Sequence, residues 1–326
     1  MSNTSTNSLH AETLRDLYAR LVLIRQVEEK IVALYPEQEM RCPTHISIGH
    51  EAVAAGVCAA LNREDVIFLN HRCHAGYIAK GGDIRGMMAE IYGKKTGCAQ
   101  GRGGSMHLVD PAAGVLGSSA IVAGTIPIAC GAAFSFSRRQ TNQVAVCFFG
   151  DAAVEEGTFF ESLNMATLWK LPVLFVCENN GYSTATPLSK RQVPGPIFER
   201  IKPFNIESLC IDGNDVVAVY QTARRVIQSM REGRGPSFIE CTTYRWREHV
   251  GPNFDWDLGY RSRDEVESWM SKCPIKQFEN RGLIPEVELG RIRREIAQKV
   301  EDAVLFAKDS PLPTFQDLFI EDPIDA

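Results

Sequence analysis

Two uninterrupted apolar runs constrain the fold of this chain more than any other feature. The run QVAVCFFG ends at Gly150, and the run PVLFVCEN ends at Asn179. Continuous apolar runs rich in Val and Phe are typical of parallel strands that are covered on both faces. Residues 158–170 lie between the runs, are long enough for a helix and are apolar on most sides. We therefore predict a strand–helix–strand unit whose helix is buried.

The same alternation continues along the chain. Residues 204–213 and 236–245 have the pattern of two further strands, and residues 215–233 have the pattern of the helix between them. A short buried strand is expected within residues 65–76, and a turn leading into a buried helix within residues 117–136. Strands that alternate with helices favour the α/β class, with a doubly wound parallel sheet.

Helical segments flank this sheet. Residues 12–35 place apolar side chains at helical spacing, with most charges on the other face. These apolar residues are Leu14, Leu17, Leu21, Ile24, Val27 and Ile31. We expect one domain over residues 1–326, with helical N-terminal (about 10–36) and C-terminal (about 264–310) extensions.

Charge and cysteine usage exclude several classes of protein. The net charge of −5 argues against a nucleic-acid partner. No apolar run approaches the roughly 20 residues that span a bilayer, so no membrane segment is expected. The polar N-terminus has no apolar signal core, and the ten cysteines include no Cys-x-x-Cys pair. A reducing, cytoplasmic location is therefore expected.

Polar residues follow the two apolar runs. Asp151 comes directly after the first predicted strand, and Asn180 after the second. A Gly-Asp pair alone is mostly a turn, but the carboxyl ends of parallel strands meet at one edge of a sheet, where ligands bind. A carboxylate and an amide oxygen are hard ligands of the kind that Mg²⁺ prefers, together with substrate phosphates. The spacing predicts Mg²⁺ held against a diphosphate.

A family resemblance extends from about Arg41 to about Pro274. It is carried, in this order, by the stretches HISIGHEA, NHRCHAG, GCAQGRGGSMH, SAIVAGTIP, ESLNMATLWKLPVLFVCENNGYS and TYRWREHVGP. The chain resembles the alpha subunit of the thiamine-diphosphate-dependent decarboxylase component of 2-oxoacid dehydrogenase complexes. That group includes the pyruvate and acetoin dehydrogenases. By contrast, no phosphate-binding GxxxxGK[ST] motif and no Gly-x-Ser-x-Gly elbow occurs.

The resemblance implies a role for each matching residue. Asp151 and Asn180 would bind Mg²⁺ through their side chains, and Tyr182 through its backbone carbonyl. His249 and His45 would be the catalytic residues, with His249 near the thiazolium ring and His45 near the mouth of the site. The residues implied to bind thiamine diphosphate are His71, Arg72, Ala120, Val122, Asp151, Ala152, Ala153, Asn180, Tyr182 and His249.

The sequence departs from the family pattern at several positions. Ala152 stands where the cofactor motif usually has glycine, His71 where tyrosine is usual, and His50 where glutamine is usual. The two regulatory serines of the mitochondrial pyruvate enzymes fall at Val250 and Gly259, so that phosphorylation switch is absent. The segment GPNFDWDLGYRSRD is also longer and more acidic than in those enzymes.

The implied activity is formation of an acyl-anion equivalent from a 2-oxoacid such as pyruvate, or from acetoin. Two alternatives remain: a carboligase that transfers a two-carbon unit to a carbonyl acceptor such as a keto-sugar, and a non-catalytic partner subunit. The resemblance implies a beta subunit in an α2β2 heterotetramer and, for the oxidative route, a lipoyl acyltransferase. The small-residue segments 52–61 and 121–134 are expected at or near subunit contacts, unless they are ordinary tight core helices.

Overall fold

A six-stranded sheet dominates the computed structural model, which describes residues 9–319 of the chain. In sheet order the strands are β2 (Val115–Ser118), β1 (Val66–Leu69), β3 (Ala145–Gly150), β4 (Val173–Asn179), β8 (Ser237–Thr242) and β7 (Glu207–Asp212). Every neighbouring pair is parallel, which confirms the predicted sheet. Sequence reasoning did not find β2, a four-residue strand at one edge.

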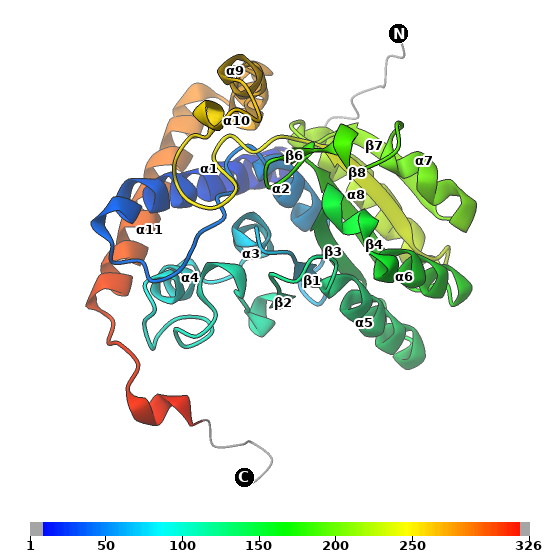
Figure 1. Ribbon diagram of the computed structural model, residues 1–326, viewed down its shortest axis with the longest axis horizontal. Coiled ribbons are helices and arrows are strands. Elements are labelled where there is room, and N and C mark those ends of the chain that lie inside the picture. Colours follow the sequence, from blue (N-terminus) through cyan, green and yellow to red (C-terminus); the bar gives the residue numbers. More distant parts are fainter. Residues whose placement is uncertain (1–8, 320–326) are drawn as a thin grey trace.

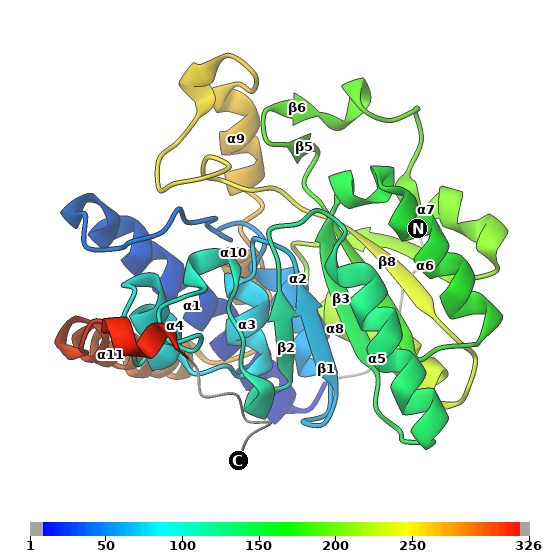
Figure 2. The same cartoon turned by 60° about the horizontal axis from the view of Figure 1, so that its bottom comes forward.

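Helices cover both faces of this sheet (Figures 1 and 2). One face packs against α5 (Thr125–Arg139), α6 (Gly157–Leu168) and α7 (Ile197–Ile201), and the other against α2 (Glu51–Ala59), α3 (His74–Lys80) and α8 (Val216–Arg231). Successive residues of β3 alternate between the two apolar cores: Val146 and Phe148 enter one, and Cys147 and Phe149 the other. The continuous apolar runs are thus buried on both sides, as predicted for a doubly wound sheet.

The predicted flanking helices are present. Residues 12–35 form α1 (Ala11–Leu34), and its predicted apolar residues are buried. The C-terminal segment forms α9 (Arg263–Met270), α10 (Pro274–Asn280) and α11 (Glu286–Asp309). Figure 1 shows α11 alongside α1, and α11 also packs against α4 (Ile84–Ile91).

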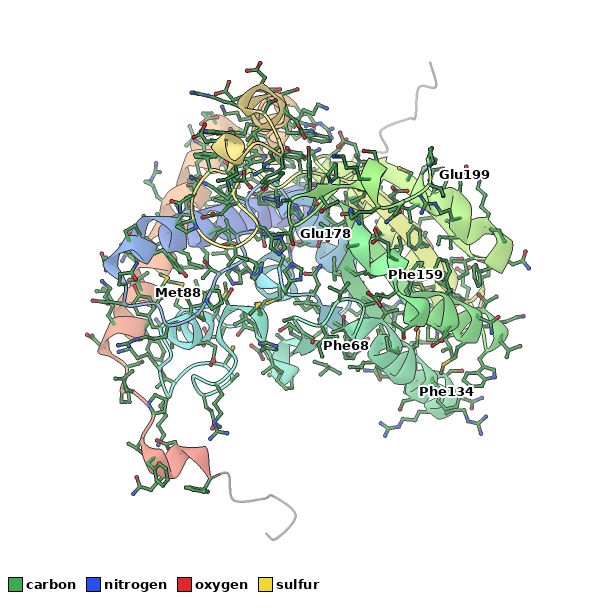
Figure 3. The ribbon with its side chains drawn as sticks, viewed as in Figure 1. Phe68, Met88, Phe134, Phe159, Glu178 and Glu199 are labelled. Carbon is green, nitrogen blue, oxygen red and sulfur yellow. The ribbon has the colours of Figure 1, made fainter. Side chains whose placement is uncertain are left out.

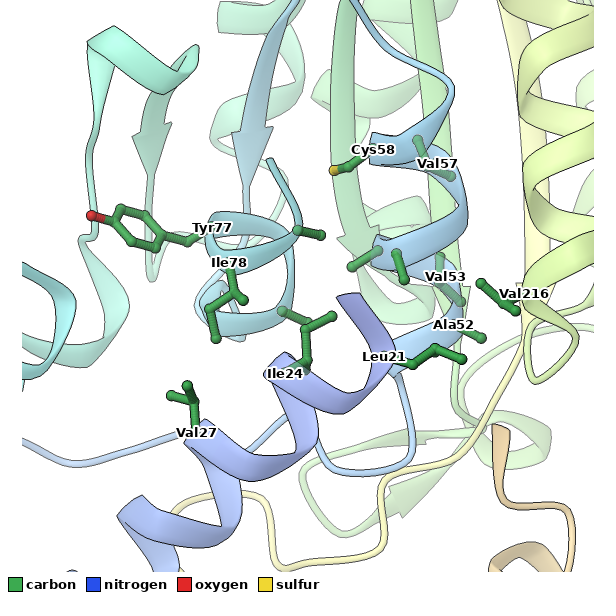
Figure 4. Close-up of a cluster of buried hydrophobic side chains, with 14 of the residues drawn as sticks. Leu21, Ile24, Val27, Ala52, Val53, Val57, Cys58, Tyr77, Ile78 and Val216 are labelled. Atoms are coloured by element: carbon green, nitrogen blue, oxygen red, sulfur yellow. The ribbon is translucent and has the colours of Figure 1, made fainter. Parts of the chain in front are cut away.

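The small residues of α2 serve packing inside the chain. Figure 4 shows Ala52, Val53 and Val57 of α2 among side chains of α1, α3 and α8. At Gly56, an added Cβ would meet Cγ1 of Val219 at 2.7 Å, so α2 and α8 approach too closely for a larger residue. Residues 51–58 are buried by the chain's own helices, which favours the alternative that this segment is a tight core helix.

The prediction that α5 and α6 are buried helices holds only for their inner faces. Ile128 on α5 is 56% exposed, and Leu168 on α6 is 71% exposed. In Figure 3, Phe159 lies against the sheet, whereas Phe134 lies at the periphery of the molecule. Within residues 9–319 no further layer covers these outer faces, so apolar composition alone overestimated their burial.

No helix within residues 9–319 is both long enough and apolar enough to cross a bilayer. The beginning of the polar N-terminal stretch, residues 1–8, lies outside the described residues, as do residues 320–326.

Candidate functional site

An open cavity with a volume of about 210 Å³ lies at the carboxyl ends of the central strands. The loops after β1, β3, β4 and β8 contribute to it, which is where open α/β sheets bind ligands. Its lining includes every predicted site residue: His45, His71, Arg72, Ala120, Val122, Asp151, Ala152, Ala153, Asn180, Tyr182 and His249. Residues from six separate segments of the sequence thus converge on one site.

Asp151 and Asn180 lie on the floor of this cavity, at the ends of neighbouring strands. Asp151 opens a short 3₁₀ helix (Asp151–Glu155) directly after β3, and it is 1% exposed. Asn180 follows β4, and its Oδ1 accepts a hydrogen bond of 3.0 Å from the backbone N–H of Tyr182. An amide oxygen has a second lone pair, so Asn180 retains an acceptor for a ligand. The predicted juxtaposition of these two residues is therefore present.

A cation already sits beside Asp151. The Arg191 guanidinium donates to the carboxylates of Asp151 and Glu155, and it comes from the segment after the small hairpin β5 (Tyr182–Ser183) and β6 (Thr186–Pro187). Gln192 Nε2 donates to the backbone carbonyl of Asp151 at 2.9 Å and so ties the same segment to Asp151 a second time. Burial raises the pKa of Asp151, while the Arg191 hydrogen bond and charge lower it, and burial prevails. A metal ion at Asp151 must share or displace this guanidinium.

Arg72 brings a buried positive charge into the cavity. It is 6% exposed, and its Nη1 donates to the Ile46 carbonyl at 2.7 Å. Its Nη2 donates to the His249 carbonyl at 3.3 Å. Burial, and then the charge of Arg245, lowers the pKa of Arg72 to about 10, so the group stays charged at neutral pH. Because these partners are neutral carbonyls, the cation remains available to an anionic ligand.

Three histidines form one wall of the cavity. The ring centroids of His45 and His71 are 4.7 Å apart, those of His45 and His249 are 5.0 Å apart, and those of His71 and His249 are 5.3 Å apart. Burial, and then the Arg72 charge, lowers the pKa values of His45, His71 and His249 to about 2, 3 and 4. The three imidazoles are therefore neutral at pH 7 and can donate a hydrogen bond without carrying charge.

The mouth of the cavity is apolar and open. Ala120 and Val122 lie in the loop before α5, and Ile121 between them is 74% exposed. Ala123, the next residue, has a φ of 60°, a left-handed conformation that is uncommon for residues other than glycine. This loop thus presents backbone groups and small side chains to the entrance.

A buried ionic network holds the segment that carries His249. Arg245 Nη1 donates to Asp255 Oδ2 at 2.9 Å, and Arg261 Nε donates to Asp255 Oδ1 at 2.7 Å. Both arginines also donate to backbone carbonyls of the 245–247 segment. Arg245 is 1% exposed, and the Asp255 carboxylate compensates its buried charge.

Sequence reasoning missed three further residues near the site. Arg191 and Asp255 act through partners distant in sequence, which no local pattern reveals. Glu178 lines the cavity beside His50, with Oε1 at 3.4 Å from His50 Nδ1, and Figure 3 places Glu178 at the centre of the molecule. Glu178 precedes the Asn-Asn pair at the end of β4, so its position at the sheet edge could have been found from the same strand pattern.

Fold and site together define an α/β protein whose ligand site lies at the carboxyl edge of a parallel sheet, with oxygen donors beside buried cations. The family described as "Dehydrogenase E1 component" matches residues 19–316. The chain therefore belongs to the dehydrogenase E1 component family of oxidoreductases, and within that family it is similar to the alpha subunits.

Similar proteins cover nearly the whole chain. The alpha subunit of acetoin:2,6-dichlorophenolindophenol oxidoreductase of Bacillus subtilis is 43% identical over 319 residues, which are 96% of this chain and 94% of that protein. The alpha subunit of the pyruvate dehydrogenase E1 component of Porphyra purpurea is 36% identical over 98% of this chain and 95% of its own length. The acetoin oxidoreductase alpha subunit of Cupriavidus necator is 38% identical over 96% of this chain and 95% of that protein.

Proposed function

We propose that this chain is the alpha subunit of a thiamine-diphosphate- and Mg²⁺-dependent enzyme that forms an acyl-anion equivalent from a 2-oxoacid such as pyruvate, or from acetoin. One observation carries the proposal: a buried, charged Arg72 and the oxygen donors of Asp151 and Asn180 line the same cavity. A ligand that combines a polyanion with a hard cation fits both groups, and metal-bound diphosphate is such a ligand.

The donor set suits this ligand. Asp151 and Asn180 would hold Mg²⁺ through side-chain oxygens, and Tyr182 through its carbonyl. Arg72 and His71 would contact the diphosphate, with the backbone of Ala152 and Ala153 beside it. The loop that carries Ala120 and Val122 would hold the aminopyrimidine ring. When bound, the cofactor supplies the carbanion chemistry.

The chain's own residues would orient the substrate and handle its protons. His249 and His45 present neutral imidazoles that can donate hydrogen bonds to an oxygen on which negative charge develops. The network around Asp255 would fix the His249 segment. The apolar mouth at Ile121 and Val122 would exclude water once it is covered.

A second polypeptide would provide that cover. Ile121, Val122 and Ile128 are exposed at and beside the cavity entrance, an arrangement that supports a beta subunit docking there in an α2β2 heterotetramer. A lipoyl acyltransferase would accept the acyl group. All ten cysteines are free, which supports a reducing, cytoplasmic location. We also propose a single domain over residues 1–326, because α1 and α11 share one apolar core with the sheet.

Turnover tests this function. The chain, with and without its partner subunit, is assayed on pyruvate, branched 2-oxoacids and acetoin, with 2,6-dichlorophenolindophenol as electron acceptor. We expect turnover of pyruvate or acetoin only when chain, partner, thiamine diphosphate and Mg²⁺ are all present. Full activity of the chain alone would contradict the two-subunit proposal, and carbon–carbon bond formation without dye reduction would favour the carboligase.

A further inference from the structure

His45, His71 and His249 bring three imidazoles together from distant parts of the sequence. His45 lies in the loop before α2, His71 follows β1, and His249 lies in the loop after β8. One ring nitrogen of each lies within 4.8 Å of those of the other two. His45 is 5% exposed, and its Nδ1 has no hydrogen-bond partner in the described part of the chain. A buried polar atom without a partner calls for an explanation.

We propose that these three histidines form a binding site for a transition-metal ion of the Zn²⁺ class, with its fourth coordination position open to the cavity. Three imidazoles and one open position are a common ligand set of zinc in proteins. The site differs in kind from that of Asp151 and Asn180, because imidazole nitrogens prefer borderline metals and carboxylate or amide oxygens prefer Mg²⁺.

The geometry requires only a small closure of the three rings. Zinc–nitrogen bonds of about 2.0–2.1 Å in a tetrahedral site place the ligand nitrogens roughly 3.3 Å apart. The largest separation here is at most 4.8 Å. All three rings line the open cavity, so side-chain rotation into that space can bring the nitrogens onto one ion.

Charges around the cluster act in opposite directions. The guanidinium groups of Arg72 and Arg245 disfavour a second cation nearby, whereas Asp255 favours one. His74 is not available as a fourth ligand, because its ring contacts Glu28 and Ser105 at 3.1 and 2.7 Å.

Occupancy of this site would compete with the ligands of the cavity. The histidines line the cavity in which the proposed cofactor and 2-oxoacid are held, and His71 is proposed to contact the diphosphate, so a bound ion would compete with both ligands at that wall. This consequence rests on the proposed function, whereas binding of the metal itself does not.

Direct titration tests the binding. Zn²⁺ is added to the full-length chain in a calorimeter with Mg²⁺ in excess, and the exposed Cys210 is replaced by Ser in every sample. We expect one Zn²⁺ per chain, with affinity weakened about tenfold or more in His71→Tyr and in His249→Asn. The exposed His107 provides the control, since His107→Ala should bind Zn²⁺ as the parent does. Circular dichroism checks that each variant is folded.

X-ray absorption of the zinc-loaded chain identifies the ligands. Nitrogen neighbours at about 2.0–2.1 Å support the site, and a shell of sulfur at about 2.3 Å would overturn it. Unchanged affinity in folded His71→Tyr, or no binding by the parent, would also overturn it. In the assembled enzyme, Zn²⁺ should raise the apparent KM for the substrate and the concentration of thiamine diphosphate needed for half-maximal activity, and it should leave kcat at saturation unchanged. If binding succeeds but this competition fails, the metal site stands and the placement of the substrate is wrong.

Discussion

His249 contributes a neutral imidazole whose pKa is lowered to about 4, mainly by burial. We predict that His249→Ala lowers kcat by about 10²- to 10⁴-fold, because a positioned hydrogen-bond donor at a developing oxyanion is lost. Cofactor affinity should fall only modestly, since the contact from Arg72 is to the backbone carbonyl of His249 and survives the substitution. Steady-state kinetics measure the change in kcat, and titration with the cofactor measures the change in affinity. A turnover of His249→Ala equal to that of the parent would show that His249 has no role in the mechanism.

Asp255 permits a second prediction at the scale of single residues. Burial raises the pKa of Asp255, but hydrogen bonds from Tyr260, Arg245 and Arg261 outweigh burial and hold it below 3.8. A carboxyl whose folded pKa is depressed stabilises the fold above its ordinary pKa, and this stabilisation is lost as the pH falls through the folded value. Asp255→Asn should therefore cost about 3 kcal/mol at pH 7, as expected when one partner of a buried ion pair is removed.

Urea unfolding of Asp255→Asn at several pH values measures this effect. The difference in the free energy of unfolding between the parent and the variant should be constant from about pH 5 to about pH 8. It should become smaller only when the pH falls below about 3.8 and Asp255 of the parent begins to take up a proton. Asp257→Asn is the matched control, because Asp257 lies in the same loop and is exposed. Equal stability of the Asp255 and Asp257 variants at pH 7 would show that the network contributes nothing.

At the scale of elements, hydrophobic patterning was sufficient for β1, β3, β4, β8 and α1, because each of them buries apolar residues. It was also sufficient for β7, whose Leu209 and Ile211 are half-buried against the core. It was insufficient for β2, whose four residues at the sheet edge include a glycine. It also could not separate α2 from α5: both are rich in small apolar residues, yet α2 is enclosed by α1 and α8, whereas α5 has one uncovered face. Which face of a helix another element covers is decided by tertiary packing, and the sequence pattern of the helix does not show it.

The same limit applies to the site. That Asp151 and Asn180 lie together was predictable, because each directly follows a strand and the carboxyl ends of parallel strands meet at one edge of the sheet. The contact of Arg191 with Asp151 could not be predicted, since it depends on how the hairpin of β5 and β6 folds back over the 3₁₀ helix that follows β3. Packing of this kind has no signature in residue spacing.

The uncovered face of α5 leads to a prediction about assembly. Replacing Ile128, which is 56% exposed, by Lys should leave the stability of the chain nearly unchanged. It should weaken association with the partner subunit by about tenfold or more, because burial of an isoleucine is worth about 1.5–3 kcal/mol. Light scattering of equimolar mixtures measures this. Val287→Lys on α11 is the control, since Val287 is 85% exposed on a different helix. Equal assembly of both variants would contradict a subunit contact at α5.

At the scale of the whole molecule, one half of the cavity comes from the two central strands of the sheet and the other half from the strands on either side of them. Loops after β1 and β8 bring positive charge and imidazoles, while the ends of β3 and β4 bring oxygen donors. Neither half alone would bind a metal diphosphate, so correct pairing of β1, β3, β4 and β8 assembles the site. The remaining open side, at the apolar mouth, accounts for the dependence on a second subunit that we propose.

Cofactor binding to Asp151→Ala tests the central claim most directly. Calorimetry on the chain assembled with its partner compares the parent, Asp151→Ala and Asp309→Ala, the last being an exposed aspartate on α11. We expect Mg²⁺-dependent binding of thiamine diphosphate to be abolished in Asp151→Ala and retained in Asp309→Ala, with all three proteins folded and assembled. Unchanged, Mg²⁺-dependent affinity in folded Asp151→Ala would show that Asp151 does not hold the metal diphosphate.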